Sequence, residues 1–224
     1  MLQSQFTTIL AALIYSLIFL KFTIASDTLS ANQTIRDGQT LVSKGQIFEL
    51  GFFSPGRSKD RFLGIWYKAT PEIVVWVENR NQPITDSKGI LTISRNGTLV
   101  LSRGERIIWS SNLSSVASSP VMRILQTGNL VLVDKTNGTS DNYIWQSFDY
   151  PCDTRLPGMQ MVDNLMVDNL GDGQDKYLQS WRNSDDPSLG DFTYRIKYRG
   201  GVVEMVVYNG KIKRCRSGPW TGHY

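Results

Sequence analysis

Two stretches of the sequence repeat one pattern, NGTLVLSRGERIIW at residues 96–109 and TGNLVLVDKTNGTSDNYIW at residues 127–145. Each stretch has a turn glycine, then Leu-Val-Leu and a polar excursion, and ends in Ile-Trp. A third, looser copy, GQIFELGFFSPGRSKDRFLGIWY, precedes them at residues 45–67. A repeat period of about 35 to 45 residues is typical of folds whose units bury their apolar faces together. The pattern predicts three β-units around one core, closed by Trp66, Trp109 and Trp145.

Alternating hydrophobicity extends beyond these copies. Segments such as ILTIS at 90–94, VMRIL at 121–125, FTYRIKY at 192–198 and VVEMVVY at 202–208 alternate apolar and polar residues between turn formers. Period-two alternation with many β-branched and aromatic residues indicates an all-β fold, a sandwich, barrel or prism. The 41% hydrophobic content is enough to form a core, so we do not expect global disorder. Because large indoles are most often core pieces, we expect structural roles for Trp66, Trp76, Trp109 and Trp145.

The N-terminus has the pattern of a secretory signal peptide over residues 1–25. An apolar run, ILAALIYSLIFL at 9–20, is followed by Thr23 and Ala25 at the −3 and −1 positions of a cleavage site. A membrane helix is the competing interpretation, but the run is shorter than the roughly 20 residues that cross a bilayer. We therefore expect a secreted, extracellular protein with no membrane span in the mature chain.

Secretion gives meaning to two further features. Asn-x-Ser/Thr sequons, expected to be glycosylated in surface turns, occur at Asn32, Asn96, Asn112 and Asn137. The two cysteines, Cys152 and Cys215, either pair with each other, lack a partner in this chain, or face another chain.

Charge and residue types exclude most other functions. The net charge of +4 comes from scattered Lys and Arg, which favours a solvated surface over a nucleic-acid interface. The single histidine, His223, lies close to the C-terminus, and the chain has neither a phosphate-binding glycine loop nor zinc-ligand clusters. Asp185 and Asp186 resemble a glycosidase acid pair, but Asp-Asp-Pro is ordinary turn chemistry. We expect no cofactor, no metal and no enzymatic activity.

The composition of the sequence changes after Trp145, where alternating hydrophobicity gives way to turn-forming residues. SFDYPCDTRLPGM at 147–159 is rich in turn residues, and MVDNLMVDNL at 161–170 is a tandem duplication suited to a loop. The sequence predicts a first β domain at 26–149. At 150–224 we expect a connector and the N-terminal part of a second, incomplete β domain.

Several long motifs carry a family resemblance. WVENRNQPITDSKGILTI at 76–93, IWQSFDYPCDTRLPGM at 144–159 and SWRNSDDPSLGDFTY at 180–194 resemble the extracellular region of plant S-locus glycoproteins and G-type lectin S-receptor-like kinases. The resemblance spans nearly the whole mature chain. It implies a bulb-type, mannose-binding-like lectin domain with a β-prism fold and pseudo-threefold repeats, followed by the start of an S-locus glycoprotein domain.

The resemblance also locates a degenerate sugar site. The family pattern is Gln-x-Asp-x-Asn-x-Val-x-Tyr, whose polar side chains bind sugar hydroxyls while Val packs on the ring. On residues 125–133 only Asn129 and Val131 remain, and on residues 94–102 Thr98 replaces Asn while Val100 remains. We therefore expect mannose binding to be lost at these strands, with the surviving residues serving as strand core.

The resemblance implies a non-catalytic recognition module for ligand perception, as in pollen recognition or defence signalling. The family's EGF-like, PAN, membrane and kinase segments are not found, so kinase activity is not carried over and we interpret the chain as truncated before them. Its expected partners are a peptide or glycan ligand, with a homodimer or a receptor-kinase partner left open. The alternative is a functional mannose-type lectin.

Overall fold

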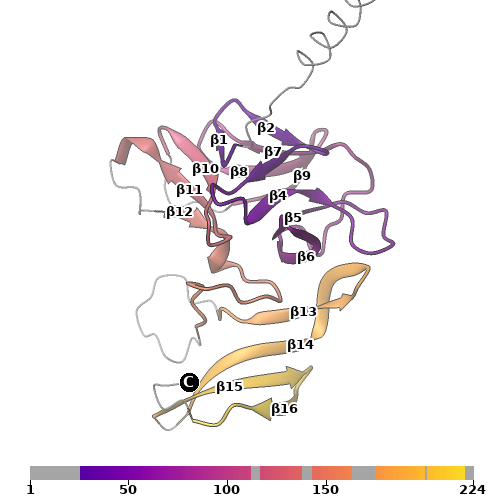
Figure 1. Cartoon of the computed structure of the whole chain (residues 1–224), viewed down its shortest axis with the longest axis vertical. Helices are drawn as coiled ribbons and strands as arrows, with labels where there is room; N and C mark the ends of the chain where they lie inside the picture. The colour runs from indigo at the N-terminus through magenta and orange to yellow at the C-terminus, as the bar shows by residue number, and fades with distance from the viewer. Residues whose placement is uncertain (1–25, 112–116, 138–142, 163–174, 200, 220–224) are drawn as a thin grey trace, which may run out of the picture.

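The chain forms two β-units, one above the other in Figure 1. The computed structural model describes residues 26–111, 117–137, 143–162, 175–199 and 201–219. The predicted signal peptide, Asn112, His223 and most of the duplicated segment lie outside the described residues. No helix in the described ranges is long and apolar enough to cross a membrane.

The first unit consists of three four-stranded antiparallel sheets. The first sheet contains β3 (Thr40–Val42), β4 (Phe48–Phe53), β5 (Phe62–Tyr67) and β6 (Thr70–Val77). The second contains β2 (Thr34–Arg36), β7 (Gly89–Ile93), β8 (Leu99–Arg103) and β9 (Arg106–Ser110). The third contains β1 (Thr28–Ser30), β10 (Pro120–Ile124), β11 (Leu130–Asp134) and β12 (Tyr143–Gln146), with short 3-10 turns at η1 (Lys135–Asn137) and η2 (Ser147–Asp149).

Each sheet takes one short strand from the N-terminal stretch and three strands that follow one another in the chain. Side chains at alternate positions of the strands point inward, and the buried ones from all three sheets form a single cluster. Pairs of almost fully buried members come from equivalent strands: Leu63 and Ile65, Leu99 and Leu101, Leu130 and Leu132. The predicted all-β prism with pseudo-threefold repeats is confirmed.

The repeat differs from the prediction in one respect. The two close copies cover β8–β9 and β11–β12, whereas the looser copy covers β4–β5, one strand earlier in its sheet. The tryptophan equivalent to Trp109 and Trp145 is therefore Trp76 on β6, and the assignment of Trp66 as the third closing residue is wrong. The Trp145 ring meets the rings of Trp76 and Trp109 edge-on, with centroids 6.3 and 5.6 Å apart. Trp66 is buried elsewhere, beside Phe53.

Each of the three sheets has an equivalent capping hydrogen bond between a polar side chain and the backbone. A side chain just after the last strand of each sheet accepts a hydrogen bond from a backbone N–H of the strand before it. The pairs are Leu63 N to Asn79 Oδ1 at 2.8 Å, Leu99 N to Ser111 Oγ at 2.9 Å, and Leu130 N to Ser147 Oγ at 2.9 Å. All three caps are buried, so each satisfies an N–H that water does not reach.

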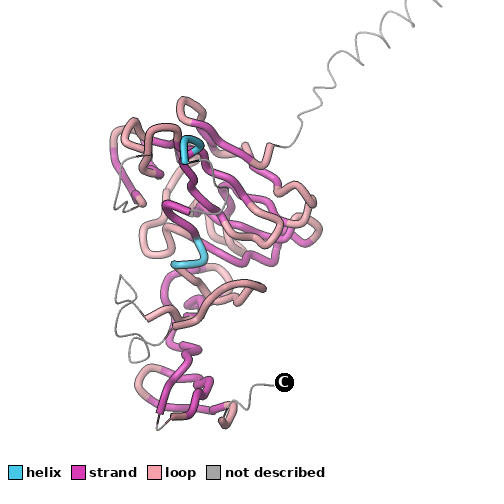
Figure 2. The backbone as a smooth tube through the Cα atoms, turned by 90° about the vertical axis from the view of Figure 1, so that its left-hand side faces the viewer, coloured by secondary structure: helices cyan, strands magenta, loops and turns pink. Residues whose placement is uncertain are grey.

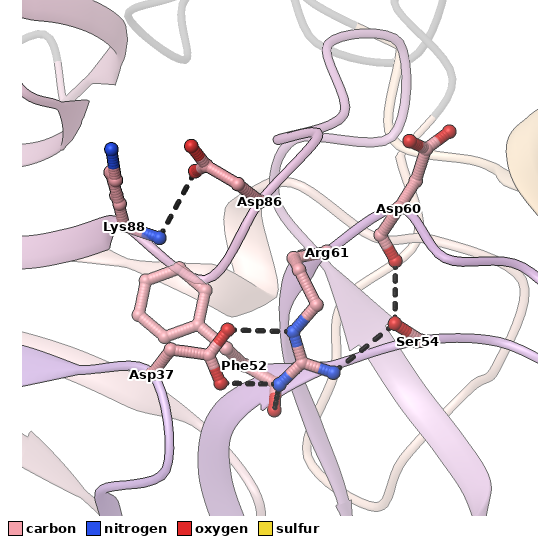
Figure 3. Close-up of polar contacts among 7 residues, drawn as sticks. All are labelled: Asp37, Phe52, Ser54, Asp60, Arg61, Asp86 and Lys88. Carbon is pink, nitrogen blue, oxygen red and sulfur yellow. Dashed lines mark hydrogen bonds and ion pairs between the residues drawn. The ribbon is translucent and has the colours of Figure 1, made fainter.

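An ion pair joins the first and second sheets. Arg61, just before β5, donates from Nε to Asp37 Oδ2 at 2.7 Å, and Asp37 follows β2 of the second sheet. Its other nitrogens donate to the carbonyl of Phe52 at 2.9 Å and to Ser54 Oγ at 3.1 Å (Figure 3). Both charged side chains are mostly buried and every carboxylate oxygen is engaged, which is the geometry in which such a pair stabilises a fold.

The second unit is a meander of β13 (Leu178–Asn183), β14 (Asp186–Arg199), β15 (Val202–Asn209) and β16 (Ile212–Arg216). It forms a separate layer below the three-sheet unit (Figure 2). Leu178 and Trp181 on β13 extend the core cluster of the first unit, and the Trp181 ring stacks on Phe53 with centroids 6.3 Å apart. The expected domain boundary at 149/150 stays a prediction.

The two cysteines are free thiols, so the alternative in which Cys152 pairs with Cys215 is wrong. Cys152 is buried under β6, where its Sγ lies 3.2 Å from both the amide nitrogen and the carbonyl oxygen of Val77. Cys215 lies exposed on β16, the edge strand of the other unit. Burial raises the pKa of the Cys152 thiol to about 12, which makes it unreactive at neutral pH.

Candidate functional site

Asn129, at the first predicted sugar position, makes hydrogen bonds that stabilise the fold. Its Nδ2 donates to Gln146 Oε1 at 2.8 Å, and its Oδ1 accepts from Ser147 Oγ and from the backbone N–H of Phe148, both at 3.2 Å. The residue is 4% exposed, and Val131 is 1% exposed. Both residues are therefore internal parts of the third sheet, and the Asn129 amide has little capacity left for a ligand.

The second predicted position lies at the turn before β8. Thr98 and Val100 are partly buried, and Thr98 donates its backbone N–H to Ser94 Oγ at 3.1 Å. The Asn96 side chain bonds to the same Ser94 hydroxyl. The polar groups of this turn thus bind one another.

The structure also identifies a third equivalent position, which the sequence reasoning did not consider. Alignment through the polar caps places Phe62 at the Asn position, Gly64 at the Val position and Trp66 at the Tyr position. In the described part of the chain, none of the three sheets retains the full set of sugar-binding side chains.

Two of the sequons are in exposed turns. Asn32 follows β1, with a positive φ of 74°, and Asn96 precedes β8. Asn137 ends η1. Glycosylation at these positions stays a prediction.

A polar concavity lies elsewhere, between the two units. It has a volume of about 550 Å³. Its walls are the end of β6 and the following turn, the connector, and the start of the second sheet. The lining residues are Trp76, Val77, Glu78, Arg80, Asn81, Asp149, Tyr150, Pro151, Cys152, Asp175, Tyr177, Gln179 and Leu189. We call this concavity the interunit cleft.

Arg80 fixes the geometry of the interunit cleft. This side chain leaves the first unit just after β6 and enters the second, where its Nε donates to the carbonyl of Pro187 at 2.6 Å. Its Nη2 donates to the carbonyls of Gln179 and Ser180 at 3.1 and 2.8 Å. The residue is only 7% exposed, so the carbonyl dipoles stand in for a counter-ion.

Three acidic side chains line the interunit cleft, and two of them hold cations of the protein. Asp149 pairs with Lys176 Nζ at 2.8 Å. Asp175 pairs with Arg195 Nη1 at 3.1 Å. The third acid is Glu78, which is partly buried, and burial raises the pKa of its carboxyl to about 8.

The residues considered for catalysis have structural roles. Asp185 accepts from the backbone N–H of Arg57 at 3.2 Å, and Asp186 accepts from that of Ser188 at 2.9 Å. The hydrogen bond from Arg57 lowers the pKa of the Asp185 carboxyl, and hydrogen bonding to Ser188 lowers the pKa of the Asp186 carboxyl, whereas a glycosidase acid needs a raised pKa. Within the described ranges, no group of three or more metal-ligating side chains gathers.

Comparison with known proteins agrees with this architecture. A family model described as D-mannose binding lectin matches residues 73–182, which overlaps both units. The sequence is 40% identical to receptor-like serine/threonine-protein kinase SD1-8 of Arabidopsis thaliana, over 92% of this chain and 24% of the relative. It is 41% identical to S-locus-specific glycoprotein S6 of Brassica oleracea, over 88% of this chain and 45% of the relative. The chain thus spans about a quarter to a half of these relatives.

Among solved structures, a monomeric monocot mannose-binding lectin from Gastrodia elata is similar, with a TM-score of 0.42 and 23% identity. The match covers 54% of this chain and 94% of that one.

Three four-stranded sheets surround one core, and residues 73–182 match the D-mannose binding lectin family model. The resemblance inferred from the sequence is confirmed. The chain is a relative of the plant S-locus glycoproteins and the G-type lectin S-receptor-like kinases.

Proposed function

We propose that the chain is a non-catalytic extracellular recognition module, serving ligand perception in pollen recognition or defence signalling rather than mannose binding. The observation that supports this proposal is that the Asn129 amide is used in hydrogen bonds within the protein. A side chain that ties two segments of its own sheet together cannot also serve a sugar hydroxyl without breaking those bonds. The relatives named as receptor kinases and S-locus glycoproteins support a role in perception.

A glycan array of the mature chain, residues 26–224, tests this proposal. We expect no binding of mannose-type glycans. Two variants place a lysine at the family's tyrosine position: Ser102→Lys on β8 and Val133→Lys on β11. Ser110→Lys, at an exposed position of β9, is the control. Mannose binding that these two variants abolish and Ser110→Lys retains would overturn the proposal.

Functional mannose binding is the second candidate, favoured by the D-mannose binding lectin match and by the partly exposed Val100. The same array decides between the two, because only this candidate predicts mannose binding that depends on Ser102 or Val133.

Secretion and partner binding complete the proposal. The apolar N-terminus and the sequons support export, which a mobility shift after endoglycosidase treatment of the secreted chain would test. Association with a receptor kinase or with a second copy is tested by light scattering after size-exclusion chromatography, alone and with a candidate kinase ectodomain. Absence of turnover on aryl glycosides is the expected result for a non-enzyme.

A further inference from the structure

One face of the second sheet carries no charged side chain. Directly opposed residues of an antiparallel pair point to the same face, and the register opposes Tyr194 to Val207 and Val207 to Cys215. Alternation along the strands gives the other members of this face. Its residues are Phe192, Tyr194, Ile196 and Tyr198 on β14, Val203, Met205, Val207 and Asn209 on β15, and Ile212 and Cys215 on β16. We call it the uncharged face.

The opposite face of the same three strands is charged. It carries Arg195 and Lys197 on β14, Glu204 on β15, and Lys213 and Arg216 on β16. Arg216 Nη1 pairs with Glu204 Oε1 at 3.2 Å across two neighbouring strands. The sheet is therefore amphipathic, and an amphipathic antiparallel sheet is stabilised when its apolar face is covered while its charged face meets water.

The first unit covers the part of the uncharged face around Tyr194. Leu178 on β13 is directly opposed to Tyr194, and both side chains contact the core cluster that joins the two units. Among the residues that the structure describes, no other member of the uncharged face belongs to this cluster. Phe192, Tyr198 and Ile212 are 48%, 43% and 59% exposed. The face thus continues the core into a surface that solvent reaches.

The exposed area of this face is that of a small interface. An aromatic side chain buries about 150–250 Å², so Phe192 and Tyr198, each nearly half exposed, present about 70–120 Å² each. Ile212 adds a similar area, and the partly buried members bring the total to on the order of 400–500 Å² per copy. Two such faces together would bury about 800–1,000 Å², at the low end of specific protein interfaces.

The chemistry and place of the uncharged face suit a second copy of the same chain. A twofold arrangement presents the same apolar residues from both sides, so the contact buries no charge. A charged partner surface would instead lose its hydration against this face. The strands β15 and β16 lie at the end of the molecule far from the three-sheet unit, so two copies can meet there without contact between their first units (Figure 1).

We propose that a second copy of this chain covers the uncharged face, sheet against sheet, in a weak symmetric dimer. The inference goes beyond the proposed function, because it gives self-association a defined surface on the second unit. The small area predicts a dissociation constant on the order of 10–100 µM rather than a permanent dimer.

Sedimentation equilibrium of the mature chain, residues 26–224, tests the proposal between about 2 and about 500 µM, with a reducing agent present to keep Cys215 a thiol. We expect a monomer at the low end and a dimer at the high end. Sodium sulfate should strengthen the dimer, because it favours apolar burial. A monomer at every concentration, or a dimer that about 0.5 M NaCl dissociates, would overturn the proposal.

Two substitutions place a charge on the uncharged face. Ile212→Asp and Phe192→Asp should each raise the dissociation constant of the dimer by about ten-fold or more, because the contact then buries an unpaired carboxylate. Ile107→Asp is the matched control, since Ile107 on β9 of the first unit is 63% exposed and the change is the same. It should leave the dimer unchanged. Near-ultraviolet circular dichroism checks each fold, and Ile212→Asp alone decides if Phe192→Asp does not fold.

Equal dimer affinities of Ile212→Asp and Ile107→Asp would also overturn the inference, and would leave the recognition module standing. Mannose binding that depends on Ser102 or Val133 would instead overturn the proposed function, whatever the oligomeric state. The two failures are therefore distinguishable.

Discussion

Replacing Arg80 with methionine tests the join between the two units. Met keeps an apolar stem of similar length and removes all the donors. The Pro187 carbonyl belongs to a buried residue, so losing its donor costs about 1–3 kcal/mol. The carbonyls of Gln179 and Ser180 belong to partly buried residues that water can reach, and each hydrogen bond is worth about 0.5–1.5 kcal/mol. We expect a loss of about 2–6 kcal/mol in the free energy of unfolding.

Urea unfolding followed by tryptophan fluorescence measures this loss, because Trp181 lies at the join and Trp145 lies in the first unit. Arg106→Met, at an exposed position of β9, is the matched control and should cost less than about 0.5 kcal/mol. Equal stabilities of Arg80→Met and Arg106→Met would refute the reasoning, since the three carbonyl bonds would then contribute nothing net.

Three further outcomes are expected. Asp37→Asn should lower the free energy of unfolding by about 1–3 kcal/mol, because the largely buried pair joining two sheets loses its charge. Asp86→Asn, in a more exposed pair, should lower it clearly less, and equal losses would contradict us. Ser147→Ala should cost about 1–3 kcal/mol in thermal or urea unfolding, and an unchanged midpoint would show that its cap is dispensable. Iodoacetamide should alkylate Cys215 in the native protein and Cys152 only after denaturation, as read by mass spectrometry; resistance of both thiols until reduction would reveal a disulfide.

Most of the fold is readable from local pattern. Alternation and turn residues predict strands because each strand must bury one face, and the twice-written Leu-Val-Leu motif marks equivalent strands of two sheets. The misassigned Trp66 shows the limit of this reasoning. A motif of glycine, alternation and Ile-Trp fits β4–β5 as well as β8–β9, and only strand pairing reveals that Trp76 occupies the equivalent position.

The interunit cleft could not be predicted from the sequence, for a different reason. Glu78, Asp149 and Asp175 come from segments far apart in the chain and belong to no common motif. Arg80 sits in a turn-like stretch, where nothing local distinguishes a buried arginine from a solvated one. Long-range packing alone decides both its burial and its partners.

The continuity of the core through Leu178 and Trp181 has a mechanical consequence. When two domains are joined by a flexible linker, a binding site between them is mobile. The entropic cost of ordering that site then lowers the affinity for any ligand. In this protein the hydrophobic core extends across the interface between the two units, so a site at this interface is ordered before a ligand binds. A destabilising substitution among the buried tryptophans of the first unit would therefore increase the mobility of a distant site at this interface and lower its affinity for a ligand.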